Sequence, residues 1–150
     1  MNDLSDIDRT ILRQLEVDAR QSNVALAQRV GLSPSACLRR VQALEERGII
    51  RSYRAVLDER TRGIGFIAYV SVGLSSHTKA AQENFERAMT AAPEVRECHN
   101  ITGVVEYLLR VEVADLPTYK SFHTDRLGAL PQVSQITTFV VMGSPKDERA

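Results

Sequence analysis

The order of hydrophobic patterns after Gly63 is the feature that most restricts how this chain of 150 residues can fold. Runs with the alternating pattern of a strand enclose a run with helical spacing, and this unit occurs twice in succession. The resulting order predicts an α+β fold, a ferredoxin-like βαββαβ sandwich in which helices cover one face of a four-stranded antiparallel sheet. The expected strands are residues 66–74, 95–101, 105–113 and 133–142, and the expected helices are residues 78–91 and a segment that begins near residue 116.

The last expected strand, residues 133–142, is apolar on both of its faces. Phe139 and Val141 alternate there with Ile136 and Val140. A sheet with helices on one face leaves the other face open to water, and a large open apolar surface usually marks an interface. The sequence therefore predicts that a second copy of the chain covers the open face.

The first 50 residues have the spacing of three short helices that are separated by capping residues. The first of them follows Ser5 or Asp6 as its cap. We expect Asn23 to cap the second helix, and Gly31 to end it in a left-handed conformation. Ser33 then caps a third helix, with Pro34 in the first helical position, and this helix runs to Gly48. Two short helices joined by a turn that contains glycine predict a helix-turn-helix. A nearly alternating segment follows the third helix and is expected to be a strand or an extended linker, which indicates a winged variant.

The third helix has two different faces when its residues are placed about 100° apart. Cys37, Val41 and Leu44 form a stripe that should pack on the other helices. The opposite side carries small, amide and guanidinium side chains, which can enter a DNA major groove about 12 Å wide and donate hydrogen bonds there. The candidate DNA-contacting residues are Ser33, Ser35, Ala36, Arg39, Arg40, Gln42, Arg51 and Arg54, with Ser33 and Arg51 or Arg54 as phosphate contacts.

The charge distribution supports a nucleic-acid partner, although the net charge of the chain is zero. Residues 29–62 carry eight arginines and four acidic residues, a local net charge of +4. Arginine suits bidentate contacts with phosphate or guanine better than lysine does. The alternative is an ordinary solvated surface, because arginine is common on exposed helices.

Four stretches of the sequence resemble the Lrp/AsnC, or feast/famine, family of bacterial and archaeal transcription regulators, nearest its leucine-responsive branch. They are LSDIDRTIL, LSPSACLRRVQALEERGII, ECHNITGVVEYLLRV and LPQVSQITTFVVM. The resemblance implies a sequence-specific regulator that binds double-stranded DNA at a pseudo-palindromic operator. It also implies dimers that commonly assemble into octamers, and an effector that is usually an amino acid.

The resemblance and the patterns together suggest four segments. Residues 1–50 would form a winged helix-turn-helix DNA-binding domain, and residues 51–62 a linker or wing strand. Residues 63–143 would form an effector-sensing and oligomerisation domain, followed by a solvated tail at 144–150.

The resemblance also suggests where an effector binds. The family pattern Gly-Asp-x-Asp-Tyr matches the stretch from Gly103 to Tyr107, but Val104 and Glu106 replace the two aspartates. Glu106 could pair with an α-amino group, whereas Val104 cannot, and Gly103 would allow close backbone approach. The alternative is a tight turn with an exposed Glu106. The candidate effector-binding residues are Thr102, Gly103, Val104, Glu106, Tyr107, Thr137 and Thr138.

The sequence gives little support for catalysis, a metal site or a cofactor. Cys98 and His99 are adjacent, so on a strand they would point to opposite faces. A sirohaem-decarboxylase-like enzyme of related fold is an alternative, but it would need a cationic pocket, and residues 61–150 have a net charge of −1. An effector-independent regulator and an oligomeric adaptor that binds protein are also compatible with the sequence.

The acidic N-terminus and the lack of a long apolar run predict a cytoplasmic protein without a membrane partner.

Overall fold

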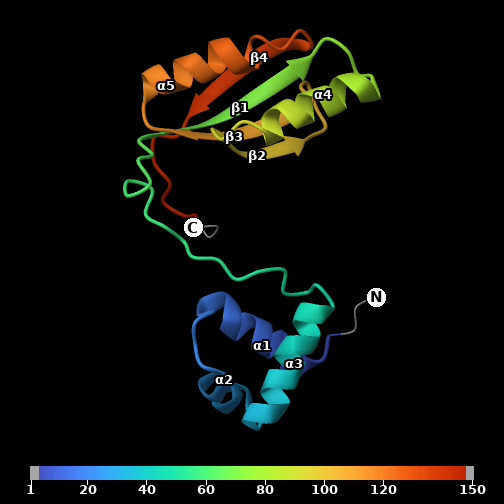
Figure 1. Cartoon of the computed structure of the whole chain (residues 1–150), viewed down its shortest axis with the longest axis vertical. Coiled ribbons are helices and arrows are strands. Elements are labelled where there is room, and N and C mark those ends of the chain that lie inside the picture. Colours follow the sequence, from blue (N-terminus) through green and yellow to red (C-terminus); the bar gives the residue numbers. More distant parts are fainter. Residues whose placement is uncertain (1–3, 148–150) are drawn as a thin grey trace. The chain divides into compact units, whose positions relative to one another are not determined.

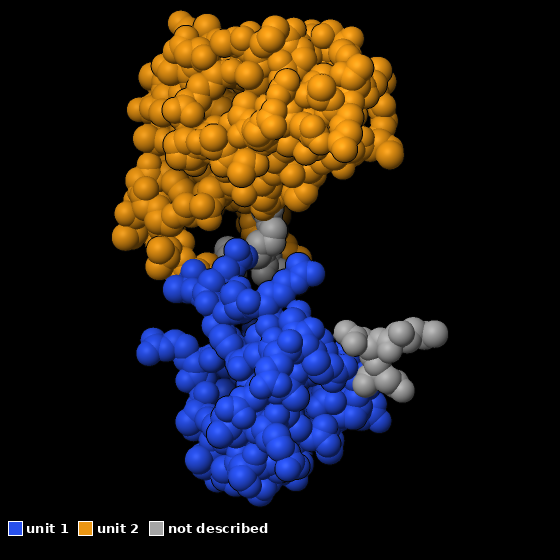
Figure 2. All heavy atoms as spheres, turned by 45° about the vertical axis from the view of Figure 1, so that its right-hand side comes forward, with its two compact units in different colours: residues 1–55 blue, residues 56–150 orange. Residues whose placement is uncertain are grey.

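The computed structural model describes residues 4–147, so the last three residues of the expected tail lie outside the described residues. The chain forms two compact units, residues 1–55 and residues 56–150. Figure 1 shows the order of the helices and strands, and Figure 2 colours the two units. Each unit has a hydrophobic core of its own, as an independently folding domain requires.

The first unit consists of the helices α1 (Asp6–Val17), α2 (Asn23–Val30) and α3 (Pro34–Glu46). Each helix follows a serine, Ser5, Ser22 or Ser33, whose hydroxyl accepts a hydrogen bond from a backbone N–H of the first turn. The expectation that Asn23 caps α2 is therefore wrong, because Ser22 does so. Asn23 is the first helical residue, and its amide donates instead to the carbonyl oxygen of Pro34 at 2.7 Å.

A glycine turn joins α2 to α3, as predicted. Gly31 has a φ of 73°, which is the left-handed region that glycine adopts without strain. The N–H of Leu32 donates to the carbonyl oxygen of Ala27 at 2.9 Å and closes the end of α2. The sequence Gly31-Leu32-Ser33 therefore redirects the chain into α3 within three residues. The helix-turn-helix arrangement is confirmed.

The core of the first unit fixes which side of α3 faces inward. Cys37 and Leu44 are buried, and Val41 packs against the same cluster, as the helical spacing predicts. The other buried residues of this core are Ile11, Leu26 and Ala27.

The segment after α3 is irregular. Within the described chain, no strand occurs between α3 and residue 66, so residues 51–62 do not form a wing strand. Asp58 organises a turn here, because its side chain accepts hydrogen bonds from the N–H and the hydroxyl of Thr61.

The second unit has the predicted βαββαβ order. Its elements are β1 (Phe66–Leu74), α4 (Lys79–Thr90), β2 (Val95–Asn100), β3 (Tyr107–Val113), α5 (Leu116–Ser121), the short π-helix η1 (Phe122–Leu127) and β4 (Val133–Val140). The strands form one antiparallel sheet in the order β2-β3-β1-β4. Both α4 and α5 pack on the same face of this sheet (Figure 1). The ferredoxin-like α+β sandwich is confirmed.

Strand alternation gives this sheet one buried face and one open face. Val70 and Val72 of β1 pack toward the helices with Leu109 of β3 and Phe85 of α4. The open face carries the intervening residues, among them Tyr69, which pairs with Phe139 of β4. Phe139 is more than half exposed, as the apolar pattern of the last strand predicted.

Candidate nucleic-acid interface and effector loop

The outward face of α3 carries the polar side chains that the sequence placed there. Ser35, Arg39 and Gln42 are exposed, and Ala36 is partly buried beside them. Among residues 4–147, Arg39 makes no hydrogen bond or ion pair. An exposed guanidinium next to small and amide side chains on one helix face can donate hydrogen bonds to a DNA groove. This face is therefore the candidate nucleic-acid interface.

Arg40 has different surroundings from its neighbour. Its Nη1 lies 2.8 Å from Oδ1 of Asp8 and 3.3 Å from the hydroxyl oxygen of Ser5, both in the first turn region of α1. The helical spacing that places Asp8 one turn before the buried Ile11 could have revealed that Asp8 faces inward. The sequence reasoning missed this contact.

Asp8 is the acidic partner in a compact cluster at the start of α1. Burial by itself raises the pKa of Asp8, but hydrogen bonds from Ser5 and Arg40, together with the charge of Arg40, outweigh burial and lower the pKa below its usual value. Asp8 also accepts from the backbone N–H of Ser5 at 3.2 Å and so completes a capping box. The carboxylate is therefore charged at neutral pH and holds Arg40.

The remaining candidate DNA contacts lie around α3. Arg51 and Arg54 are exposed in the segment that follows the helix. Ser33 is exposed as well, and its hydroxyl caps α3 by accepting from the N–H of Ala36 at 3.3 Å.

The candidate effector loop, residues 102–106, connects β2 to β3. Val104 projects fully into solvent at its tip. Gly103 has a φ of 143°, but nothing lies within 4 Å of the position that a Cβ would take. The glycine therefore serves the backbone conformation of the loop, and the space beside it is open, so the expected close approach of an effector stays a prediction.

Glu106 is held inside the loop. Its carboxylate accepts a hydrogen bond from the backbone N–H of Leu74 at 2.6 Å and lies 3.2 Å from Nδ1 of His77. The alternative of an exposed Glu106 is wrong, because the side chain is mostly buried. The carboxylate ties the loop to the end of β1.

Tyr107 belongs to the core and not to the exposed loop. Its ring is fully buried, with its centroid 4.5 Å from that of Phe85. Its hydroxyl donates to Glu86 at 2.8 Å, and burial together with this hydrogen bond raises the pKa of Tyr107 to about 12.

The two candidate threonines of β4 face opposite sides of the sheet. Thr138 pairs with Val70 on the helix side and hydrogen-bonds Tyr119, whereas Thr137 pairs with Ser71 on the open side. The strand β1 separates β4 from β3, so the structure does not gather these threonines with the loop that contains Thr102.

No metal site is formed by the described residues, since no group of three or more potential ligands occurs among them. Cys98 packs against the core and His99 lies in the next position of β2, where it approaches Glu97 at 3.2 Å. Burial, with a smaller contribution from Glu86, raises the pKa of the Cys98 thiol to about 11. This thiol is therefore protonated and a poor ligand.

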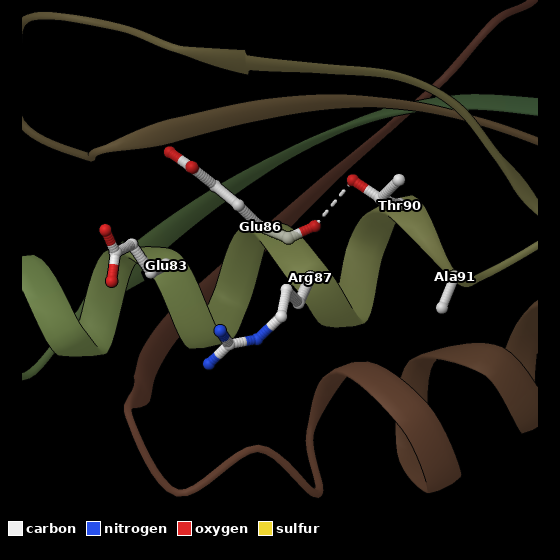
Figure 3. Close-up of a pocket in the computed structure, with 5 residues that line it drawn as sticks. All are labelled: Glu83, Glu86, Arg87, Thr90 and Ala91. Carbon is white, nitrogen blue, oxygen red and sulfur yellow. Dashed lines mark hydrogen bonds between the residues drawn. The ribbon is translucent and has the colours of Figure 1, made fainter.

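An open depression of about 560 Å³ lies along α4 (Figure 3). Its lining residues are Glu83, Glu86, Arg87, Thr90 and Ala91. Glu86 is directed toward the strands, where it accepts from Tyr107, and Arg87 hydrogen-bonds Asn84. The lining polar groups are thus occupied by intrachain partners, and none of the candidate effector residues lines this depression.

Within residues 4–147, none of the helices has the length and apolar character needed to cross a membrane.

Each of the two units matches a known protein family. The winged helix-turn-helix DNA-binding family matches residues 4–51, and the Lrp/AsnC ligand-binding domain family matches residues 67–150. A proline dehydrogenase transcriptional activator of Rhizobium radiobacter is 40% identical over 146 residues, which are 97% of this chain and 94% of the relative. The leucine-responsive regulatory protein of Escherichia coli K12 is 39% identical, over 96% of this chain and 88% of the relative.

A solved structure matches nearly the full length of this chain. The crystal structure of a transcriptional regulator from Neisseria meningitidis in complex with L-Met is 34% identical, with a TM-score of 0.92, and the match covers 97% of this chain and 94% of that one. The relatives are regulators of transcription, which confirms the expected DNA-binding regulator and does not favour the decarboxylase-like alternative. The chain belongs to the Lrp/AsnC family of transcriptional regulators.

Proposed function

We propose that this regulator reads a specific DNA sequence with the outward face of α3. Arg39, with Ser35 and Gln42, would contact base edges in the major groove, and Arg51, Arg54 and Ser33 would contact phosphates. The observation that carries this proposal is the orientation of α3, whose buried side is fixed by Cys37 and Leu44 and whose opposite side exposes Arg39.

The experiment begins with the full chain and a pool of random DNA duplexes. Repeated selection of bound duplexes gives a preferred sequence, and its scrambled version is the reference for non-specific binding. Selection of a pseudo-palindrome would support a dimer that presents two α3 helices to successive major grooves, about 34–36 Å apart. An adaptor that binds only protein would enrich no sequence.

The phosphate contacts are tested by salt. We expect the affinity for the selected duplex to fall as salt rises, and Arg51→Ala to reduce the slope of log K against log salt by about 0.9 if the side chain neutralises one phosphate. Arg87→Ala is the matched control, because this arginine lies on α4 of the second unit. A salt-independent affinity, or an equal change of slope in both variants, would remove the proposed phosphate role of Arg51.

The open sheet face supports self-association through the second unit. Phe139, together with Tyr69 and Leu108, makes this face partly apolar, and such a surface is stabilised when a second copy excludes water from it. We therefore propose a dimer formed through this face, with further assembly to octamers.

Substitution of Phe139 tests the proposed dimer. We expect Phe139→Asp to weaken dimerisation at least about tenfold, because an unpaired carboxylate would be buried at the interface. Sedimentation over a range of concentrations measures the effect. Val17→Asp, an exposed valine of α1, is the control. Equal masses for Phe139→Asp and the unaltered chain would place the dimer contact elsewhere.

The L-Met in the complex of the Neisseria relative suggests that this chain also binds an amino acid and responds to it. We propose that the loop 102–106 contributes to that site, with Glu106 exchanging its contact with His77 for the α-amino group of the effector. Coupling to DNA would occur through a change in oligomer geometry. Titration with individual amino acids, L-Met and L-Leu first, would reveal the effector as a change in oligomer mass or DNA affinity. No change with any of them would favour an effector-independent regulator.

A further inference from the structure

Two adjacent arginines of α3 differ in what they contact. Arg39 is exposed and has no partner among residues 4–147, whereas the Arg40 guanidinium bridges to α1. The Arg40 side chain is 38% exposed, and the Asp8 side chain is only 11% exposed. A mostly buried carboxylate favours a charged partner strongly, because water cannot replace that partner. The surroundings of the two arginines therefore suit them to different roles.

The ion pair between Asp8 and Arg40 links α1 to α3. Asp8 belongs to the capping box that begins α1, so its side chain is already fixed by Ser5. Arg40 lies in the middle of α3, between the inward stripe and the outward face. An ion pair between a fixed carboxylate and the flank of α3 restricts how far that helix can rotate about its axis. Cys37 and Leu44 already fix which side of α3 is buried, so the ion pair limits only the smaller rotations that this packing allows, and such rotations change the direction in which Arg39 points.

The pair also lowers the charge that Arg40 can offer to DNA. With Nη1 of Arg40 2.8 Å from Asp8, the pair has no net charge, so it attracts a phosphate less strongly than an unpaired guanidinium does. The same reasoning does not apply to Arg39, which keeps its full charge on the outward face.

We infer that Arg40 is a positioning residue, which together with Asp8 refines the orientation of α3 that the buried Cys37 and Leu44 establish, and that Arg39 supplies the arginine contact to DNA. This inference rests on the proposed function, because it assigns different roles within that same interface. It replaces the expectation that both arginines contact DNA directly.

The variant Asp8→Asn separates the two roles by the sign of its effect. If Arg40 contacted DNA directly, loss of the carboxylate would free the guanidinium and tighten binding to the selected duplex. If the pair positions α3, the same change weakens binding to the selected duplex. We expect the ratio of specific to non-specific affinity to fall about tenfold, while binding to the scrambled duplex stays equal or becomes tighter because one negative charge is lost.

A double-mutant cycle provides the second measurement. We expect Arg40→Gln to weaken specific binding in the unaltered chain and to have little further effect in the Asp8→Asn background, because its role depends on the pair. Arg40→Lys should restore part of the specificity, since an ammonium can keep a single ion pair. Arg39→Gln should weaken specific binding equally in both backgrounds. Amide hydrogen exchange of α1 and α3 shows whether each variant is folded at the temperature of the binding assay.

Two binding results would overturn the inference: tighter specific binding by Asp8→Asn, or an equal loss of specific binding from Arg40→Gln in both backgrounds. The same double-mutant cycle is also measured by urea unfolding. Additive effects of Asp8→Asn and Arg40→Gln on the free energy of unfolding would overturn the inference as well. Failure of the proposed function looks different, because the unaltered chain would then select no sequence from the pool. In that case the unfolding cycle still decides whether Asp8 and Arg40 act as a pair.

Discussion

Leu44→Ala is expected to unfold the DNA-binding unit while leaving the second unit intact. Leu44 is 1% exposed, in a core that contains only a few large side chains. Truncation of a buried leucine to alanine costs about 2–5 kcal/mol. A unit of this size rarely has more than about 3–5 kcal/mol of stability, so the substitution removes most of the total. The core of the second unit shares no residue with it.

Peptide-resolved amide hydrogen exchange measures the two units separately in the same sample. We expect residues 6–46 to lose protection and residues 66–140 to keep it, with self-association unchanged and affinity for the selected duplex at least about 100-fold weaker. Leu38→Ala is the matched control, since Leu38 lies on the same helix and is 46% exposed. Its cost should be below about 1 kcal/mol. Loss of protection in both units would show that their stabilities are coupled, and unchanged DNA binding would exclude α3 as the reading helix.

The architecture of the second unit was predictable because one strong signal controls it. The hydrophobic period changes between two and 3.6 along the chain, and each change marks an element whose buried face follows from the same spacing. The predicted strand 66–74 matches β1 residue for residue, and the predicted helix 78–91 corresponds to α4, in which Thr78 is the cap and not the first helical residue. The π-helical turn after α5 was not predictable, because its hydrogen bonds differ from those of an α-helix by one residue and leave little trace in the pattern.

The candidate effector residues were only partly predictable. The family motif places Tyr107 at the effector site, whereas the strand period directs its side chain into the core. Alternation along β3 places Tyr107 on the same side as the core residues Leu109 and Val111, which is where the structure has it. The same alternation requires Thr137 and Thr138 to face opposite ways. The motif describes a position along the chain, whereas the period describes the direction of the side chain. Contacts such as Asp8 with Arg40 join residues 32 positions apart and need the packed structure.

A buried cluster of charges on the open side of the sheet could not be predicted, because some of its partners lie in irregular segments. Arg110 of β3 is only 9% exposed, and its Nη2 lies 2.9 Å from Glu112 and 3.4 Å from Glu59. Its Nη1 lies 3.8 Å from Asp147, near the end of the described chain. Glu112 also contacts Arg62 at 3.4 Å. These ion pairs fasten the turn before β1 to the sheet.

Glu112→Gln is therefore expected to destabilise the second unit by about 3 kcal/mol, because it removes the nearest countercharge of a buried arginine. Glu59 and Asp147 remain, but one is half exposed and the other is more distant, so they offset only part of the loss. Urea unfolding followed by tyrosine fluorescence measures the change, because the chain has no tryptophan and three of its four tyrosines lie in this unit.

The matched control for Glu112→Gln is Glu83→Gln, which alters an exposed ion pair with Lys79 on α4. Its effect should stay within about 0.5 kcal/mol, because exposed pairs of this kind contribute little. The double variant Arg110→Leu/Glu112→Leu should be more stable than Glu112→Gln, because it removes the buried charge together with its partner. Similar destabilisation by Glu112→Gln and Glu83→Gln would show that water reaches Arg110. In that case the cluster would not fasten the turn to the sheet, and the first residues of the second unit would move independently of β3.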